Sequence, residues 1–467
     1  MLIMRVATTL VVCVWLASLA VAQETPAPQF GVEVNDRIDS TMAYTEIGKN
    51  GVCSLWVIGG RRPRVLVSGD IPVAPRWVVR DRAFQWSPDG RRIAFASPRD
   101  NKFDIYLAQP TGGAPSRVAH AFGPGKLAFD WDPTSRFLSI WVDDGRGGPV
   151  FVLDTAEHEL AEVSAGMVAT RPVWATSQPK LAFVARSDKG RALYVVEAGA
   201  ERAKASVCAE GGLSGNVWWS PTGAELVAEA ADADGTPRVL YMASASGGQV
   251  RPISQNVAQP RFADWSPDGR RVAFAGQVGG TGLALYLATA PWAAPPVAIV
   301  GAPGDGMLLE QVGDAIGSEQ WAAWSPSGDA LCYVAGPSDT VKNRWLYVAG
   351  PDGSGRRAMS EPVECRGFRW SPDGRSLLFA GRRGSQGRLS ITAYVVPASG
   401  SSADLRRLVP NVGHIAWSPD GRYVSYVTFD IYDRNHQLLQ VADPTGAANP
   451  QRVAEAMEEY AWAPVGR

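Results

Sequence analysis

The chain has few of the residues and motifs on which most enzyme sites depend. It contains only four histidines, at positions 120, 158, 414 and 436, and they are far apart in the sequence. No G-x-S-x-G nucleophile elbow, phosphate loop or dinucleotide fingerprint occurs. We therefore expect no cofactor, no bound metal and no catalytic residues of a recognisable motif class.

An excess of charge of one sign is also missing. The chain has 45 Lys and Arg against 46 Asp and Glu, a formal net charge of −1. Proteins that bind nucleic acid usually carry a basic excess, so we expect no nucleic-acid partner. Hydrophobic residues make up 46% of the chain, which excludes a disordered protein. The 49 Gly and 34 Pro disfavour long helices.

Long apolar runs are absent except at the N-terminus. The run from Val6 to Val21 follows Arg5 and ends in the small-residue sequence Ala20-Val21-Ala22. This arrangement predicts a secretory signal peptide over residues 1–22 that is cleaved after Ala22, with an uncleaved membrane anchor as the alternative. We expect a periplasmic or secreted protein with no membrane span after cleavage. Residues 23–39 are predicted to form a short linker.

Cysteine is scarce, and four cysteines remain after the predicted cleavage: Cys53, Cys208, Cys332 and Cys365. None belongs to a C-x-x-C pair, so a zinc or redox motif is not indicated. An exported protein can form disulfides, and a Cys332–Cys365 bond stays open as one interpretation. We favour the other, in which all four are small buried residues.

Tryptophan, in contrast, is abundant and regularly spaced. The sequence Trp-Ser-Pro-Asp-Gly or a degenerate copy of it begins at nine positions: Trp86, Trp131, Trp174, Trp219, Trp265, Trp324, Trp370, Trp417 and Trp462. Seven of the eight intervals are 43 to 47 residues long, and the other is 59. Short runs of β-branched and aromatic residues follow each copy, as in strands. This period is typical of the four-stranded blades of a β-propeller.

The repeated motif has a physical explanation. Ser, Pro, Asp and Gly suit the successive positions of a tight turn, which would connect the innermost strand of a blade to the next strand. The Trp before the turn then lies on the innermost strand, where its large apolar surface can pack between neighbouring blades. We therefore interpret the nine tryptophans as structural. A stacking platform for sugars or bases is the alternative.

The number of blades follows from how the chain begins and ends. Eight motifs, from Trp86 to Trp417, lead into three further strands, whereas Trp462 does not. Three strand-like runs between Met42 and Val67 have no motif before them. We predict an all-β fold, a single closed propeller over residues 40–467, with nine blades and with N- and C-terminal strands sharing one blade. Closure of this kind removes exposed sheet edges. Eight blades is the alternative, because nine exceeds the usual number.

The intact motifs are followed by strands such as Ile93-Ala94-Phe95 and Ile105-Tyr106-Leu107. In this they resemble the WD40-like propeller repeats of the TolB family, and the resemblance covers residues 40–467. It implies a propeller fold and the binding of a protein or peptide. TolB has six blades and an N-terminal α/β domain. We expect a larger ring here and no such domain, because too few residues precede the repeats, so a role in a Tol–Pal system is not carried over.

Two acidic residues could in principle form a catalytic pair. Asp130 and Asp264 each precede a motif Trp, near the expected centre of the ring, and paired carboxylates can cleave glycosides. They belong to non-adjacent repeats, and we interpret them as solvated or hydrogen-bonded acids.

Propeller ligands usually bind at the face opposite the tight turns, by analogy with other propellers. The 59-residue interval adds about 13 residues between 291 and 320, and long loops on rigid scaffolds often carry function. We expect the partner to contact this insertion and a neighbouring loop, with the following candidate residues: Asp314, Glu319, Trp321, Arg434 and His436.

The sequence thus favours an exported, non-enzymatic propeller that binds a protein or peptide on one face. Two other hypotheses stay open. The chain is alternatively a glycan- or peptide-processing enzyme that uses carboxylates of the central channel, or an extracytoplasmic small-ligand sensor or structural module.

Overall fold

The computed structural model describes most of the chain from residue 38 to residue 465. The gaps are residues 49–51, 61, 70, 76–78, 80–81, 124, 188–189, 200–205, 211, 232–236, 279–281, 302–304, 314–319, 338–343, 383–390, 430–436, 447–448 and 456. The predicted signal peptide, and the predicted linker up to residue 37, lie outside the described residues. Within the described part, no helix is long and apolar enough to span a membrane.

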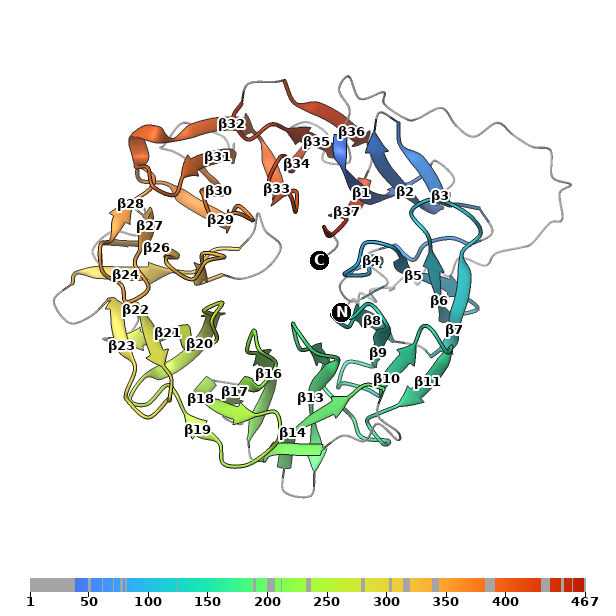
Figure 1. Cartoon of the computed structure of the whole chain (residues 1–467), viewed down its shortest axis with the longest axis horizontal. Helices are drawn as coiled ribbons and strands as arrows, with labels where there is room; N and C mark the ends of the chain where they lie inside the picture. Colours follow the sequence, from blue (N-terminus) through green and yellow to red (C-terminus); the bar gives the residue numbers. More distant parts are fainter. Residues whose placement is uncertain are drawn as a thin grey trace, which may run out of the picture.

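Nine sheets are arranged as blades around a common axis (Figure 1). We number the blades along the chain and give their strands from the innermost outward. Blade 1 contains β37 (Met457–Trp462), β1 (Ile38–Ile47), β2 (Cys53–Gly60) and β3 (Arg64–Val67). Blade 2 contains β4 (Phe84–Trp86), β5 (Ile93–Arg99), β6 (Lys102–Ala108) and β7 (Ser116–Phe122). Blade 3 contains β8 (Lys126–Trp131), β9 (Phe137–Asp143), β10 (Val150–Asp154) and β11 (Glu159–Glu162).

The next three blades follow the same pattern. Blade 4 contains β12 (Val173–Trp174), β13 (Lys180–Ser187), β14 (Gly190–Glu197) and β15 (Ser206–Glu210). Blade 5 contains β16 (Leu213–Trp219), β17 (Glu225–Ala231), β18 (Pro237–Ser244) and β19 (Arg251–Pro252). Blade 6 contains β20 (Ala258–Trp265), β21 (Arg271–Val278), β22 (Gly282–Thr289) and β23 (Val297–Val300).

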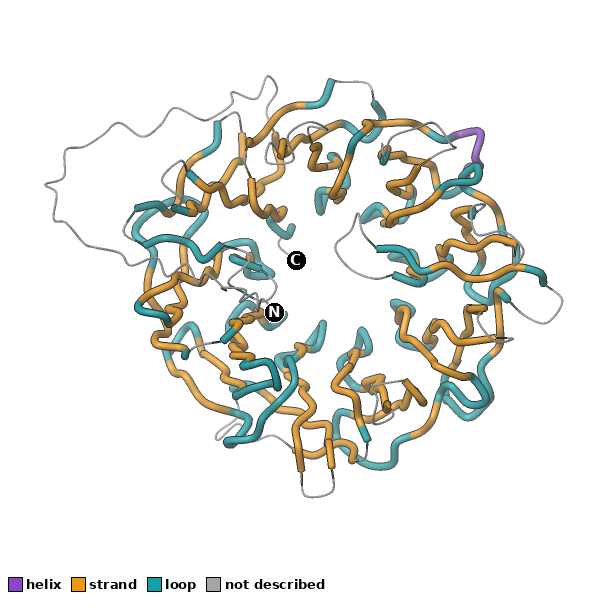
Figure 2. Tube along the Cα trace, turned by 180° about the vertical axis from the view of Figure 1, so that it is seen from behind, coloured by secondary structure: helices purple, strands orange, loops and turns teal. Residues whose placement is uncertain are grey.

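The last three blades complete the ring. Blade 7 contains β24 (Met307–Glu310), β25 (Ala322–Trp324), β26 (Leu331–Pro337), β27 (Trp345–Ala349) and β28 (Arg357–Ala358). Blade 8 contains β29 (Glu364–Trp370), β30 (Ser376–Arg382), β31 (Thr392–Pro397) and β32 (Arg406–Pro410). Blade 9 contains β33 (Val412–Trp417), β34 (Val424–Phe429), β35 (Gln437–Ala442) and β36 (Gln451–Glu455). The one helix in the described part of the chain is the short 3-10 turn η1 (Ser402–Asp404), drawn in purple in Figure 2.

The two ends of the chain meet in blade 1, as predicted. Strand β1 pairs antiparallel with β37, with Met42 opposite Trp462 and Ala43 opposite Ala461. The nine-bladed count is therefore confirmed, and the eight-bladed alternative is excluded. This pairing leaves no blade without its innermost strand, so the ring has no open sheet edge at the junction of the termini.

The long interval between Trp265 and Trp324 is explained by a split innermost strand in blade 7. Strands β24 and β25 both pair with β26: Glu310 lies opposite Val334, and Ala322 lies opposite Tyr333. Residues 311–321 thus lie between two strand segments that both pair with β26. The interval of 59 residues predicted the length of this insertion but not its position within the blade.

Between adjacent blades, apolar side chains from the two facing sheets form the core. In five blades an aromatic residue of the second strand stacks on its cross-strand tyrosine in the third, with ring centroids 5.1 to 5.9 Å apart. The Phe95–Tyr106 pair in blade 2 is one example. Cross-strand aromatic pairs of this kind stabilise sheets. The Ile-Ala-Phe and Ile-Tyr-Leu runs of the sequence are these two strands.

Candidate functional site

The repeat tryptophans connect neighbouring blades by hydrogen bonds as well as by packing. In seven blades the indole N–H donates to the carbonyl of the residue before the preceding blade's Trp, at 2.9 to 3.4 Å. The indole of Trp462 donates instead to the Ser425 hydroxyl at 2.8 Å. That of Trp324 has no hydrogen-bond partner among the described residues. Packing and hydrogen bonding both therefore fix most of these side chains.

Seven of the nine tryptophans are at most 9% exposed, but Trp370 and Trp417 are only partly buried. The sixth residue after a repeat Trp can lie over the Trp of the next blade and cover it. Arg92 at this position lies over Trp131, with its Cζ 5.0 Å from the ring centroid. Tyr423 stacks on Trp462 in the same way, with centroids 6.3 Å apart.

In the two blades that precede Trp370 and Trp417, the residue at this sixth position is small. It is Ala330 in the blade before Trp370 and Ser376 in the blade before Trp417. Neither side chain is long enough to cover an indole. The exposure of these two tryptophans therefore follows from side-chain size in the neighbouring blade.

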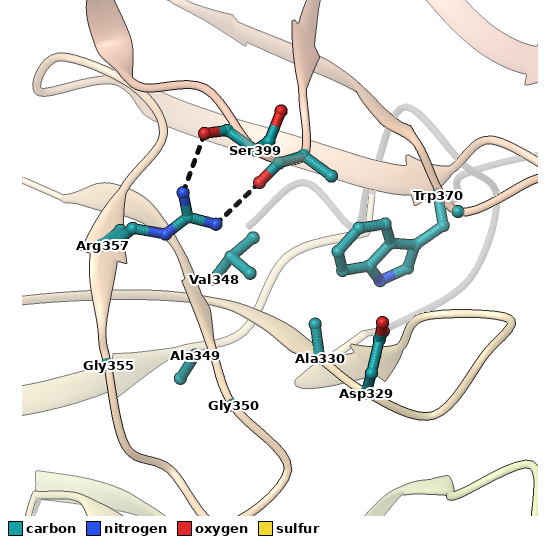
Figure 3. A pocket seen from close by; sticks show the side chains of 11 residues that line it. Asp329, Ala330, Val348, Ala349, Gly350, Gly355, Arg357, Trp370 and Ser399 are labelled. Atoms are coloured by element: carbon teal, nitrogen blue, oxygen red, sulfur yellow. Dashed lines mark hydrogen bonds between the residues drawn. The ribbon is translucent and has the colours of Figure 1, made fainter.

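A cavity of about 330 Å³ lies beside Trp370, between blades 7 and 8 (Figure 3). Its walls come from both blades: Asp329, Ala330, Val348, Ala349, Gly350, Gly355, Arg357, Trp370, Gly374, Ala398 and Ser399. Asp329 and Gly374 belong to the tight turns that follow the repeat tryptophans. We call this side of the ring the turn face. The cavity thus opens at the turn face and not at the opposite face, where the sequence led us to expect the partner.

Two charged residues stand on different sides of the cavity (Figure 3). Arg357 donates to the carbonyls of Ala398 at 2.8 Å and Ser399 at 3.0 Å, and so ties blade 7 to blade 8. The Asp329 carboxylate accepts hydrogen bonds from the hydroxyls of Ser327 at 2.6 Å and Ser325 at 2.7 Å. These two bonds lower the pKa of Asp329, so its carboxylate is charged at neutral pH.

The turn that contains Asp329 departs from the intact motif. In blade 2 the motif Asp89 accepts from Ser87 at 2.6 Å, whereas blade 7 has Ser327 at the position of Asp89. Asp329, two residues later, takes over the bond to the motif serine. The structural role of the motif carboxylate is kept, but its charge moves to the rim of the cavity.

The two acids near the centre of the ring have separate protein partners. Asp130 accepts from Gln85 in blade 2 and from Arg171 before β12, both at 2.8 Å. Asp264 accepts from the backbone N–H of Trp324 at 2.9 Å. Burial raises the pKa of Asp264 to about 7, although backbone N–H groups of Trp324 and Trp265 oppose the shift. Blades 4 and 5 stand between the two acids in the ring, and each acid connects neighbouring blades.

The structure places one of the five predicted contact residues. Trp321 is 8% exposed and lies in the core with Leu309 and Trp324, so its indole supports the insertion from within. Asp314, Glu319, Arg434 and His436 lie outside the described residues. The sequence analysis missed Asp329, Ala330 and the exposed face of Trp370. An alignment of the eight repeats from Trp86 to Trp417 at the sixth position after the Trp would have revealed Ala330.

Three of the cysteines, Cys53, Cys332 and Cys365, are buried with free thiols. Cys332 and Cys365 share one core cluster between blades 7 and 8, and burial raises the pKa of both. The side chain of Cys208 lies outside the part that the structure describes. Across all described residues, no group of three or more His, Cys, Asp or Glu could hold a metal ion.

Comparison with solved structures supports the fold. A structure described as that of the eukaryotic initiation factor is 15% identical with a TM-score of 0.64, and the match covers 91% of this chain and 99% of that one. An oligogalacturonate lyase in complex with manganese is 15% identical with a TM-score of 0.43, covering 88% and 97%. A putative TolB from Agrobacterium tumefaciens is 17% identical with a TM-score of 0.35, covering 60% and 97%.

No family model matches the chain, and no curated protein matches it. At an identity of 15%, the overlap with the first of these structures shows a shared fold and no more. The architecture is a nine-bladed β-propeller, consistent with the propeller fold that the resemblance to TolB-type repeats implied.

Proposed function

We propose that the chain is an exported, non-enzymatic β-propeller that binds a protein or peptide partner on one face, with the Trp370 cavity as a contact. The observation that carries the proposal is this cavity, an opening of about 330 Å³ beside a partly exposed indole. Ligand pockets typically measure about 300–1,000 Å³ and combine apolar walls with a few polar groups. The cavity is at the small end of this range, a size that suits one side chain of a partner.

The geometry favours binding over catalysis by carboxylates at the ring centre. A glycosidase of either stereochemical class uses two carboxyl groups that flank one bond. Asp130 is held in an ion pair with Arg171 at 2.8 Å, and Asp264 is bonded to the backbone of Trp324. Both acids are therefore used in contacts between blades, which is a structural role.

The opposite face remains a second proposed contact surface. Its candidate residues are those expected from the sequence in the insertion and the neighbouring loop: Asp314, Glu319, Arg434 and His436. The proposal for this face rests on the sequence, because all four residues lie outside the described part of the chain.

Crosslinking distinguishes these surfaces. The tagged full-length protein is expressed in its host and crosslinked in the envelope fraction, and the crosslinked peptides are identified by mass spectrometry. We expect a partner whose crosslinks cluster on blades 7 and 8 at the turn face. Recovery should fall in Trp370→Ala and persist in Trp417→Ala, the matched control. The proposed function is wrong if no partner is recovered or if all crosslinks are also obtained with an unrelated exported protein.

A further inference from the structure

We propose that the Trp370 cavity receives an arginine side chain of the partner, with its guanidinium stacked on the Trp370 indole. This inference rests on the proposed function and specifies the chemistry of the partner. The inference comes from a comparison of the repeats. The interface of blades 2 and 3 shows which side chain fills the space that is empty between blades 7 and 8.

In the interface of blades 2 and 3, an arginine of the chain itself occupies this space. The guanidinium of Arg92 lies over the Trp131 ring, 5.0 Å from its centroid. It donates to the hydroxyl of Thr155 at 2.9 Å and to the carbonyl of Ser135. One indole face and two oxygen acceptors therefore hold the planar cation in place.

The Trp370 cavity has the same walls as the space that Arg92 fills. Trp370 corresponds to Trp131, and Ala330 corresponds to Arg92, by position in the repeat. The arginine is thus replaced by a methyl group, and the cavity lies where the remainder of such a side chain would be.

Backbone geometry confirms the correspondence of the other two walls. Gly374 corresponds to Ser135: both are fourth after the Trp and both have left-handed φ, 71° and 64°. Ala398 corresponds to Thr155, because each donates its backbone N–H to the carbonyl five residues after the Trp. Gly374 and Ala398 both line the cavity. The Gly374 carbonyl therefore stands where the Ser135 carbonyl accepts from Arg92, whereas the hydroxyl of Thr155 has no counterpart in Ala398.

The charge at the rim favours a cation. At the fifth position after the Trp, six repeats carry arginine: Arg91, Arg136, Arg270, Arg375, Arg422 and Arg467. The repeat that forms this cavity carries Asp329 there. The Asp329 carboxylate stands on the Trp370 side of the cavity, whereas the guanidinium of Arg357 points toward Ser399 and away from Trp370 (Figure 3). A tyrosine, as in the Tyr423–Trp462 pair, would fill the space but would bring no positive charge to the Asp329 carboxylate.

The test uses three small probes and one assigned signal. The full-length protein is labelled with 5-fluorotryptophan, and the signal of Trp370 is assigned with Trp370→Phe. The probes are the N-acetyl methylamides of arginine, lysine and citrulline, which is the neutral shape analogue of arginine. We expect the arginine probe to shift the Trp370 signal at millimolar concentration, the lysine probe to bind roughly fivefold more weakly, and the citrulline probe to leave the signal unchanged.

Three variants localise the effect. Ala330→Arg restores the side chain that blade 2 carries, so we expect it to fold and to abolish the shift. Ser376→Arg covers Trp417 instead and should leave the Trp370 titration unchanged, which makes it the matched control. Asp329→Asn keeps an acceptor for Ser325 but removes the charge, and should weaken arginine binding several-fold.

The outcomes separate this inference from the proposed function. Equal shifts with arginine and citrulline, no shift in the wild-type protein, or a shift that persists in Ala330→Arg each refute the arginine site. If crosslinking still identifies a partner, the proposed function stands, and only the statement that an arginine of the partner enters the cavity is wrong. If a partner crosslinks at the cavity through a residue other than arginine, the inference is likewise refuted.

Discussion

At the scale of single residues, the sixth position after a repeat tryptophan affects how much of the next indole reaches solvent. Arg92 and Tyr423 cover their neighbours, whereas Ala330 and Ser376 do not. An indole that is buried and hydrogen-bonded contributes more to stability than one that is partly hydrated, because its apolar surface is removed from water completely.

Replacement of tryptophan by alanine should therefore cost different amounts in different blades. Trp219 is 5% exposed and donates to the Val173 carbonyl at 2.9 Å, so we expect Trp219→Ala to lower the free energy of unfolding by about 3–5 kcal/mol. Trp417 is partly exposed with a bond of 3.4 Å, and Trp417→Ala should cost clearly less. Urea denaturation measures both. Equal losses would contradict our account of indole burial.

A second residue-scale prediction concerns Asp264. In the unfolded chain its pKa is the ordinary value near 4, whereas burial raises the pKa to about 7 in the folded protein. The folded state therefore binds a proton at Asp264 more tightly, so the contribution of this residue to stability is fully present below about pH 4 and is lost as the pH rises from 4 to 7. We expect Asp264→Asn to flatten this decline in denaturation experiments at pH 5 and pH 8.

Two other acidic residues test whether the fall in stability with rising pH comes from Asp264. Glu46 also has a pKa raised to about 7, by burial and by Glu455, so part of the decline should remain in Asp264→Asn. Hydrogen bonding to Ser266 lowers the pKa of Asp268, and Asp268→Asn should leave the slope between pH 5 and pH 8 unchanged. If Asp264→Asn does not alter the change in stability between pH 5 and pH 8, the Asp264 carboxyl does not titrate in this range.

At the scale of the structural elements, the tight turns pack on one another around the ring. The glycine of each intact turn adopts a left-handed φ, as at Gly269 with φ of 68°. A Cβ added to Gly269 would lie 3.8 Å from Pro221 Cδ, in the turn of the preceding blade. The turn sequence therefore serves both the local conformation and the contact with the next turn.

We expect Gly269→Ala to lower the free energy of unfolding by about 1–2 kcal/mol, the cost of a left-handed conformation for a residue with a Cβ. Steric overlap adds little, because the added atom makes only ordinary contacts of 3.7 and 3.8 Å. Gly123→Ala is the control: no heavy atom lies within 4 Å of its added Cβ. Denaturation curves of both variants provide the comparison, and a neutral Gly269→Ala would contradict the role of the turn glycine.

The sequence predicted the elements better than it predicted the site. The spacing of the tryptophans and the three strand-like runs before Trp86 were sufficient for nine blades and their closure. The split of the innermost strand in blade 7 was not predictable, because an interval of 59 residues does not say where the extra residues pair. The cavity was missed because it depends on residues of two blades, Ala330 and Trp370, that are 40 positions apart in the sequence.

At the scale of the whole molecule, the ring is closed only by the pairing of β1 with β37. We expect a chain truncated after residue 455 to lose its cooperative thermal transition and to aggregate, because the edge of β1 and the buried Met42 and Tyr44 become exposed. Calorimetry and size-exclusion chromatography measure these effects. A synthetic peptide of residues 455–465 should restore the transition, and a scrambled peptide should not. A truncated chain as stable as the full one would refute the closure.

The shared blade also has a consequence for the order in which the protein is made. Residues 457–462 are synthesised after every other described strand, yet they complete the first blade of the ring. Until they are available, Met42 and Tyr44 lack the cover that Met457 and Trp462 give them, and the ring has a gap. Closure of the ring therefore has to wait until residue 462 has been made, or has crossed a membrane if the chain is exported.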